Sequence, residues 1–325
     1  MNSLARLFAA LIVLMLSGVG AKAQEKAQEK AQDKLTLALG QRGNWDTAVA
    51  ELGQQAGIFQ KHGLSLDILW TQGAGESQQA LLSGSADIGL LGTQSAFAIL
   101  ARGAPLRIIA AEATGAADFW YVRANSPIKS FKDTTDKTVA YSTAGASTNT
   151  MALAFTKEAG AKAKLVATGG PSATLVQVMT DQIDVGWSAP PFGLAQINNN
   201  EIRVIGYGKD LQSVRGQTIR VLVTVAQKQD ARPAVFARFL RAYRETLDWM
   251  YAGDDALKPY AGFANIPFAT AKQVRDEFFP KDILQPEHVM GLDALMADAV
   301  TFKYIAAPLS KDQIADLIRI PTPEK

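Results

Sequence analysis

Residues 35–92 read LTLALGQRGNWDTAVAELGQQAGIFQKHGLSLDILWTQGAGESQQALLSGSADIGLLG, and this stretch alternates strand patterns with helix patterns. We predict strands at 35–39, 64–70 and 87–91 and helices at 48–62 and 77–82. Such an order builds right-handed β-α-β units and hence an open parallel sheet in an α/β fold. Ligands of these sheets bind outside the carboxyl ends of the strands. The loops there are polar yet poor in catalytic side chains, which favours binding over catalysis.

The chain opens with the pattern of a 23-residue export signal. Arg6 supplies the positive charge, residues 7–16 are apolar, and the small residues Ala21 and Ala23 predict cleavage before Gln24. The alternative is a membrane-spanning helix, but a span needs about 20 apolar residues and this run is shorter. The charged repeat at 24–34 is interpreted as a flexible, solvated tail, with a functional spacer as the alternative.

Charge and cysteine content exclude several classes of protein. Removal of the signal takes away Arg6 and Lys22, which leaves 31 Lys and Arg residues against 31 Asp and Glu residues. A chain of formal charge near zero has no broad basic face for nucleic acid or anionic lipid. The chain has no cysteine, which excludes disulfides, thiolate catalysis, Cys-ligated metals and a lipid anchor on an amino-terminal cysteine. We therefore expect an unanchored protein of the periplasm.

A second α/β unit follows the first with its elements in a similar order. Its strands are predicted at 138–141, 164–166 and 183–187, and its helices at 151–159 and 173–179. The chain crosses between the units near 112–118 and again near 217–224, and two extended crossings make a hinge. The predicted division is lobe 1 at 35–114 plus 222–325 and lobe 2 at 115–221.

Later patterns return the chain to the first lobe. Residues 219–225 alternate as a strand that could rejoin the first unit. Pro233 is predicted to start a long amphipathic helix through Tyr251. Its apolar face is Val235, Phe236, Phe239, Leu240, Tyr243, Leu247 and Met250. Ser310 is predicted to cap a final helix.

Several motifs resemble those of the substrate-binding proteins of ABC importers for nitrate, sulfonates and taurine. They are AVAELGQQAGIFQKHG at 48–63, LLSGSADIG at 81–89, GAPLRIIA at 103–110, SPIKSFKD at 126–133, GAST at 145–148, QID at 182–184 and PPF at 190–192. The resemblance implies a two-lobed periplasmic binding protein of type II (Venus-flytrap), with two crossover hinge strands and an ABC permease as partner. Asp136 stands where the family usually has Gly, and Asp181 lies near a second such position, but Asp tolerates left-handed backbone better than most residues.

The segment Gly145-Ala-Ser-Thr-Asn149 is the first candidate site, because it joins a strand to the start of a helix. Backbone N–H groups at a helix amino terminus bind anions, and Ser147, Thr148 and Asn149 add side-chain donors. The alternative is ordinary helix capping by the same residue types.

Aromatic and charged residues supply further candidates. Trp45 follows the first strand, beside Arg42 and Asp46, where a ring could stack on a planar ligand. The alternative places Trp45 in the packing of the lobe, Asp46 at a helix cap and Arg42 in a surface ion pair. Trp187 and Phe192 end a strand of the second lobe and would face Trp45 on closure, or else pack between the lobes.

Four polar residues complete the predicted ligand contacts. Thr93, Gln94 and Ser95 lie at the carboxyl end of the third strand. Glu112, near the first crossing, faces the cleft or fixes the hinge. The chain has two histidines and no cysteine, so we expect no metal site and no cofactor. No nucleophile elbow, phosphate loop or dinucleotide motif occurs.

These observations predict a periplasmic receptor, not an enzyme, that binds a small organic anion between two lobes and delivers it to an ABC permease. A sulfonate or an aromatic acid is favoured over nitrate as the solute. The protein is expected to be a monomer with no nucleic-acid partner. The alternatives are an enzyme similar to the thiamine-pyrimidine synthases, which share the fold, and a solute sensor for a membrane signalling protein.

Overall fold

The computed structural model describes residues 32–322 of the chain. The predicted export signal and residues 24–31 of the predicted tail lie outside these residues. The tail prediction is wrong at its end, because the first strand, β1 (Asp33–Gly40), already includes Asp33 and Lys34. Backbone pairing with the whole length of β2 (Leu64–Thr71) orders these two residues.

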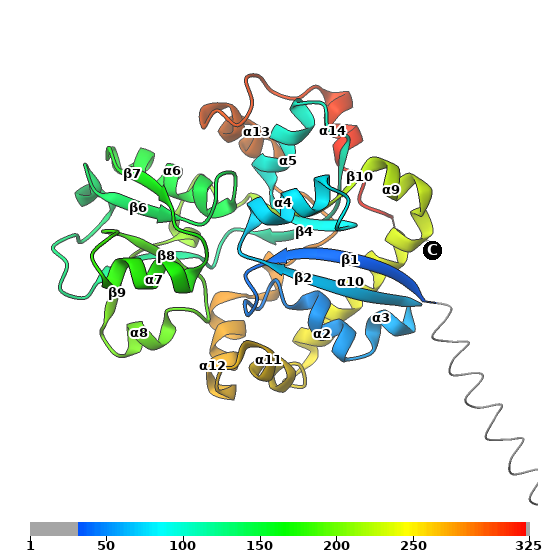
Figure 1. The fold of residues 1–325 in the computed structure, drawn as a ribbon, viewed down its shortest axis with the longest axis horizontal. Coiled ribbons are helices and arrows are strands. Elements are labelled where there is room, and N and C mark those ends of the chain that lie inside the picture. The colour runs from blue at the N-terminus through cyan, green and yellow to red at the C-terminus, as the bar shows by residue number, and fades with distance from the viewer. Residues whose placement is uncertain (1–31, 323–325) are drawn as a thin grey trace, which may run out of the picture.

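A five-stranded sheet forms the centre of the larger lobe (Figure 1). Its strand order is β2, β1, β3 (Ile88–Gly92), β10 (Thr218–Val225) and β4 (Leu106–Thr114). The predicted parallel order holds for β1, β2 and β3. β10 runs antiparallel between β3 and β4, so the sheet is mixed. The predicted return of 219–225 to the first unit is thereby confirmed.

Side chains on the two faces of this sheet enter two separate cores. Along β10, Val221 and Val223 belong to one core and Leu222 to the other; along β4, Ile108 and Ile109 divide in the same way. Successive side chains of a strand point to opposite faces of the sheet, so consecutive apolar residues bury both faces of these strands. Helices therefore cover both faces of the sheet (Figure 1).

The helices of one face are α2 (Val49–Gln55), α3 (Ile58–Lys61) and α10 (Pro233–Ala252); those of the other are α4 (Ala74–Leu82), α5 (Thr93–Ala101), α13 (Leu292–Thr301) and α14 (Lys311–Leu317). The helix predicted at 48–62 is wrong as one element, because Gly57 adopts φ 75° and separates α2 from α3. α4 begins three residues earlier than the helix predicted at 77–82, so residues 74–76 are helical as well.

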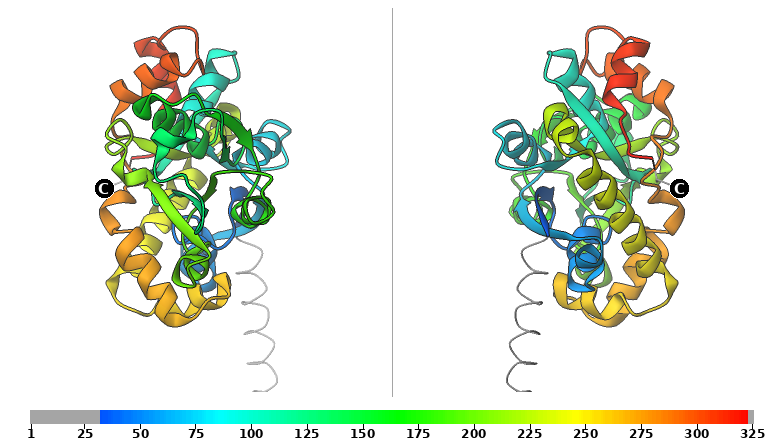
Figure 2. Two further views of the ribbon diagram at one scale, coloured as in Figure 1. Left: turned by 90° about the vertical axis from the view of Figure 1, so that its left-hand side faces the viewer. Right: turned by 90° about the vertical axis from the view of Figure 1, so that its right-hand side faces the viewer.

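The long helix α10 is confirmed, and all seven of its predicted apolar residues are buried. It stands in the foreground when the molecule is viewed from the end opposite the smaller lobe (Figure 2, right). Ser310 caps α14 as predicted, by accepting a hydrogen bond from the backbone N–H of Gln313. The remaining helical elements of this lobe are α9 (Ala226–Ala231), α11 (Leu257–Ala264), α12 (Phe268–Gln273), a π-helical turn at Val274–Phe278 and a 3₁₀ turn at Lys281–Ile283.

The smaller lobe lies to the left in Figure 1 and contains two short sheets. One is antiparallel, with β5 (Phe119–Arg123) between β8 (Gly186–Ser188) and β9 (Ile202–Tyr207). The other pairs β6 (Thr138–Tyr141) in parallel with β7 (Lys164–Ala167). Its helical elements are α6 (Ser147–Ala159), α7 (Pro171–Met179), α8 (Leu194–Asn198) and 3₁₀ turns at Phe131–Thr134 and Gly208–Asp210.

Two connections join the lobes, as predicted. The chain leaves the large sheet after β4 and enters β5 at Phe119, and it returns between β9 and β10. The division of the chain at 221/222 stays a prediction, and β10 already pairs with β4 at Thr218. Asp136 and Asp181 adopt φ 63° and 58°, the left-handed backbone that Asp tolerates better than most residues. Within the described range, none of the helices combines the length and apolar character of a membrane span.

Gly53 tests the close packing of α2 against α10. A Cβ at this position would overlap the side chain of Thr246 and lie 2.7 Å from the ring of Phe59. We expect Gly53→Ala to lower the free energy of unfolding by ~1–3 kcal/mol through overpacking, measured by urea denaturation. Gly262 of α11 has open space around it, and Gly262→Ala is expected to stabilise the protein by about 0.5–1 kcal/mol. Equal stability of the two variants would contradict this packing.

Candidate binding site

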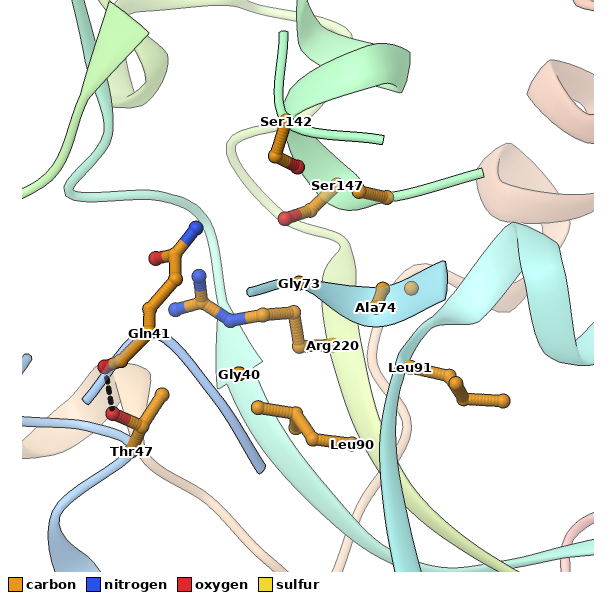
Figure 3. A pocket seen from close by; sticks show the side chains of 12 residues that line it. Gly40, Gln41, Thr47, Gly73, Ala74, Leu90, Leu91, Ser142, Ser147 and Arg220 are labelled. Atoms are coloured by element: carbon orange, nitrogen blue, oxygen red, sulfur yellow. Dashed lines mark hydrogen bonds between the residues drawn. The ribbon is translucent and has the colours of Figure 1, made fainter. Parts of the chain in front are cut away.

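A small cavity of about 30 Å³ lies where the two lobes meet. The large lobe contributes Gly40, Gln41, Thr47, Gly73, Ala74, Leu90, Leu91, Gly92 and Arg220, and the small lobe contributes Ser142, Ala146 and Ser147. The two serines face Gln41 and Arg220 across the gap (Figure 3). Since a water molecule needs roughly 10–15 Å³ of such space, the cavity has room for little more than water. The lobes are therefore nearly closed on each other.

Three helix amino termini converge on this cavity. Each cavity-lining residue Gly73, Gly92 and Ala146 is the N-cap of a helix, respectively α4, α5 and α6. None of the three N-cap residues caps its helix with its own side chain, although the N–H of Gly75 in α4 donates to Thr143 Oγ1 of the small lobe. Backbone N–H groups and the positive ends of the helix dipoles are thus directed at one small volume. This geometry suits an anion.

The guanidinium of Arg220 forms one wall of the cavity and is the centre of a buried charge cluster, here called the Arg220 cluster. Arg220 is 8% exposed and projects from β10. Its Nη2 donates to Asp46, its Nε donates to Glu112 at 2.8 Å, and its Nη1 lies 3.8 Å from Asp118. The cluster thus consists of one cation and three buried carboxyl groups.

Burial governs the ionisation of this cluster. Burial, together with the nearby charge of Asp118, raises the pKa of Glu112 to about 8. Burial also raises the pKa of Asp118 to about 7 and lowers that of Arg220 to about 10. The buried carboxyl groups outnumber the buried cation in this cluster, so burial favours the protonated forms of Glu112 and Asp118.

Contacts between the lobes surround the cavity. Ser95 Oγ donates to the carbonyl oxygen of Gly145 at 2.6 Å, and the N–H of Gly75 donates to Thr143 Oγ1 at 3.3 Å. On the far side, the hydroxyl of Tyr304 donates to Asn149 Oδ1 at 2.9 Å. These bonds connect the starts of α4, α5 and α6 directly across the cleft.

The structure places the polar candidates at or near this closure. Ser147 lines the cavity. Thr148 Oγ1 accepts from the N–H of Ser142, and Asn149 Oδ1 accepts from the N–H of Gly145, so these two side chains stabilise the loop. Thr93 Oγ1 donates to the carbonyl oxygen of Thr218.

Gln94 is buried, and its Nε2 has no partner among the described residues. It follows Thr93 in the first turn of α5, close in sequence to the cavity-lining Gly92.

The aromatic candidates occupy packed interiors. Trp45 is fully buried, donates from Nε1 to the Tyr251 hydroxyl at 2.8 Å, and packs edge-on against Tyr260. Trp187 is also fully buried, opposite Trp120 on the neighbouring strand. Neither ring lines the cavity. The packing alternative therefore describes Trp45, which fills the core of its lobe. Trp187 is buried within its own lobe, where the sequence suggested either ligand contact or packing between the lobes.

The remaining candidates have other contacts. Arg42 is exposed, and its guanidinium stacks on the ring of Phe263 at 4.6 Å. Phe192 reaches across the cleft to Gly43, where an added Cβ would lie 3.1 Å from its ring. Asp46 and Glu112 contact Arg220 and lie behind it, outside the cavity lining. Asp46 therefore acts on the site through Arg220, where the sequence suggested direct contact or helix capping.

Arg220, Gln41, Thr47 and Ser142 were missed by the sequence analysis, although all four line the cavity. Arg220 had a signal, since it is the only charged residue in TIRVLVTV, a strand of otherwise uncharged residues at 218–225. A buried charge must have partners, so this residue could have been singled out. The other three are common polar residues with no distinctive pattern.

The fold is that of the two-lobed periplasmic binding proteins. The alkanesulfonate-binding protein SsuA from Xanthomonas axonopodis pv. citri, bound to MOPS, superposes with a TM-score of 0.74 at 14% identity, over 89% of this chain and 99% of that chain. The periplasmic nitrate-binding protein NrtA from Synechocystis PCC 6803 gives 0.71 at 14% identity, over 89% and 86%. The desulfurization enzyme DSZB gives 0.59 at 14% identity, over 87% and 96%.

A family assignment follows from the sequence itself. The model of the family described as NMT1/THI5 like matches residues 45–256, so the chain belongs to the NMT1/THI5-like family. The resemblance to nitrate- and sulfonate-binding proteins is confirmed. No curated protein gives a significant match.

The raised pKa values in the Arg220 cluster predict a pH-dependent stability. Above about pH 5 the unfolded chain has lost the protons of Glu112 and Asp118, while the folded protein keeps the proton of Asp118 up to about pH 7 and that of Glu112 up to about pH 8. The folded state therefore binds more protons, and its stability falls as pH rises, by up to ~1.4 kcal/mol per pH unit for each carboxyl group.

Urea denaturation of Glu112→Gln at pH 5, 6, 7 and 8 checks this expectation. The variant should lose much of the pH slope, because an amide does not titrate. Asp255→Asn, at an exposed position outside the cluster, should keep the parent slope. Identical slopes in all three proteins would show that Glu112 ionises normally.

Proposed function

We propose that the protein is a periplasmic receptor that binds a small organic anion between its lobes and delivers it to an ABC permease. The observation that carries the proposal is the convergence of three helix amino termini and Arg220 on one interlobe cavity. Export by the amino-terminal segment, and a monomeric state, are parts of the same proposal. Affinity would come from charge-assisted hydrogen bonds formed out of water.

Closure gives such a receptor its signal. A permease distinguishes loaded from empty receptor only if the two differ in their open and closed populations. The cavity takes residues from both lobes. An organic anion is larger than water, so it would enter with the lobes further apart than they lie here, and it would then contact both lobes and favour closure around it. The two connections near Asp118 and Thr218 supply the hinge.

The solute class follows from the cavity lining. Backbone amides and hydroxyl groups suit a sulfonate, a carboxylate or nitrate. Trp45 and Trp187 suggested a ligand with an aromatic ring, but neither residue lines the cavity. An aromatic acid is therefore no longer favoured over other organic anions. The likeness to an alkanesulfonate-binding protein supports placing sulfonates first.

We propose a receptor in preference to an enzyme. The cavity lining contains no imidazole and no carboxylate, so it offers no evident general base. Among residues 32–322, no group of three or more His, Cys, Asp or Glu residues is arranged to hold a metal. A sensor for a membrane signalling protein would use the same closure, and only its partner would differ. Turnover of any sulfonate by the purified protein would overturn the receptor proposal.

Thermal melting against a panel of methanesulfonate, ethanesulfonate, benzoate and nitrate tests the solute class. A ligand at a hundred times its dissociation constant adds about 2.7 kcal/mol to stability, which raises the melting midpoint by roughly 5 °C or more in a chain of this size. Ser147→Ala should weaken binding about five-fold, since one hydrogen bond contributes ~1 kcal/mol. Ser172→Ala, at an exposed position, should bind as the parent does. A panel without any shift would contradict the proposed solute class.

Gly92 tests the role of closure. A Cβ there would lie 2.6 Å from the carbonyl oxygen of Gly145 and 3.2 Å from the backbone nitrogen of Ser147. We expect Gly92→Ala to hold the lobes apart, enlarge the radius of gyration in small-angle scattering and weaken anion binding at least ten-fold. Gly262→Ala, with no atoms near the added methyl group, should do neither. Unchanged affinity in Gly92→Ala would show that this closure is not needed for binding.

A further inference from the structure

We propose that the cavity takes a monoanion together with a proton, and that Glu112 and Asp118, acting through Arg220, exclude dianions. The inference rests on the proposed anion receptor and names the charge that its ligand carries. Glu112 and Asp118 are positioning residues here, since neither lines the cavity.

The first step is the crowding of carboxyl groups around one guanidinium. Arg220 donates to Asp46 and Glu112 and lies 3.8 Å from Asp118. Glu112 Oε1 and both carboxyl oxygens of Asp118 are buried without a hydrogen-bond partner among the described residues. An ionised oxygen in that condition is costly, and a protonated carboxyl group is much less so. The cluster therefore holds a proton in order to remain close to neutral.

The second step is the effect of a ligand. Arg220 presents its remaining face to the cavity (Figure 3), so a bound anion adds a negative charge beside an already shared cation. Each added charge favours the protonated form of nearby carboxyl groups. Anion binding and proton binding must then strengthen each other, because linkage is reciprocal.

The third step is the limit on ligand charge. One added negative charge can be balanced by a proton on the Glu112–Asp118 pair. A second has no partner, because Arg220 is the only charged residue in the lining of this cavity. The three helix dipoles add about half a charge each, or ~1.5 charges in all. Arg220, however, is already shared by Asp46, Glu112 and Asp118, so a dianion leaves more uncompensated negative charge than a monoanion does. Sulfate and methanesulfonate have nearly the same shape, so the site would separate them by charge alone.

The other groups facing the cluster do not supply the proton. Helix α10 places Tyr243 beside it, and burial and the charge of Glu112 raise the pKa of this phenol well above its usual value. Asp46 is the direct ion-pair partner of Arg220. The groups that remain to hold the proton are Glu112 on β4 and Asp118 on the first connection between the lobes. Burial already raises the pKa of both toward neutrality.

Isothermal calorimetry with methanesulfonate and with sulfate tests the proposal from pH 6 to 9. We expect the dissociation constant of methanesulfonate to rise by up to about ten-fold per pH unit above pH 7, as one proton is lost per bound anion. Sulfate should bind at least ten-fold more weakly at every pH. Repeating the titration in two buffers of different ionisation enthalpy should reveal proton uptake on binding.

Glu112→Gln and Asp118→Asn should reduce the pH slope and the proton uptake, while Asp255→Asn should keep both. If Glu112 and Asp118 had only a structural role, the two variants would change the affinity and leave its dependence on pH as it is in the parent. A second measurement needs no ligand: carboxyl carbon NMR of the free protein should show at least one of the two groups titrating between pH 6 and 9. Titration of both below pH 5 would overturn the inference.

The two proposals fail differently. If neither methanesulfonate, ethanesulfonate, benzoate nor nitrate binds at any pH, the proposed receptor for small organic anions fails and the inference fails with it. If a monoanion binds with the same affinity at pH 6 and pH 9, the receptor stands and the proton coupling is overturned. Equal binding of sulfate and methanesulfonate would overturn the exclusion of dianions.

Discussion

The guanidinium of Arg220 is buried between the two connections that join the lobes, and the arrangement of the site depends on it. It lies on β10, the strand by which the chain returns to the large sheet, and it contacts Glu112 on β4. Its third carboxyl neighbour, Asp118, belongs to the outgoing connection. A buried charge of this kind is tolerated only with partners, so the cluster holds both connections and the loop carrying Asp46 in one place.

Around this cluster the backbone does most of the recognition chemistry. Helices α4, α5 and α6 all begin at the cleft, and their first residues are Gly, Ala, Thr and Ser, with no bulky side chain in the way. Glycine is needed at position 92 because the backbone of 145–147 approaches so closely. The same close approach forms the Ser95–Gly145 hydrogen bond that closes the lobes. The amino termini of the same three helices thus close the lobes and face the ligand.

Prediction from the sequence succeeded where a pattern is local and periodic. The apolar face of α10, the alternation of β10 and the cap at Ser310 were all read correctly, because each depends on neighbours a few residues away. The predicted single helix at 48–62 failed at Gly57, where one positive φ divides it. The start of α4 was placed too late, because Gly73-Ala-Gly is a typical loop sequence.

The chain's own sequence determined the α/β class, the order of the elements, the two crossings and the family, since these follow from periodicity and motif order along the chain. It also pointed to the start of α6, where Ser147 proved to line the cavity. Tertiary structure alone decided which candidates meet. It buried Trp45 and Trp187 in lobe cores, placed Asp46 and Glu112 behind Arg220, and brought Gln41 opposite Ser147. These pairs are far apart in sequence, so no local pattern relates them, and only the folding of two lobes across a shared cleft brings them together.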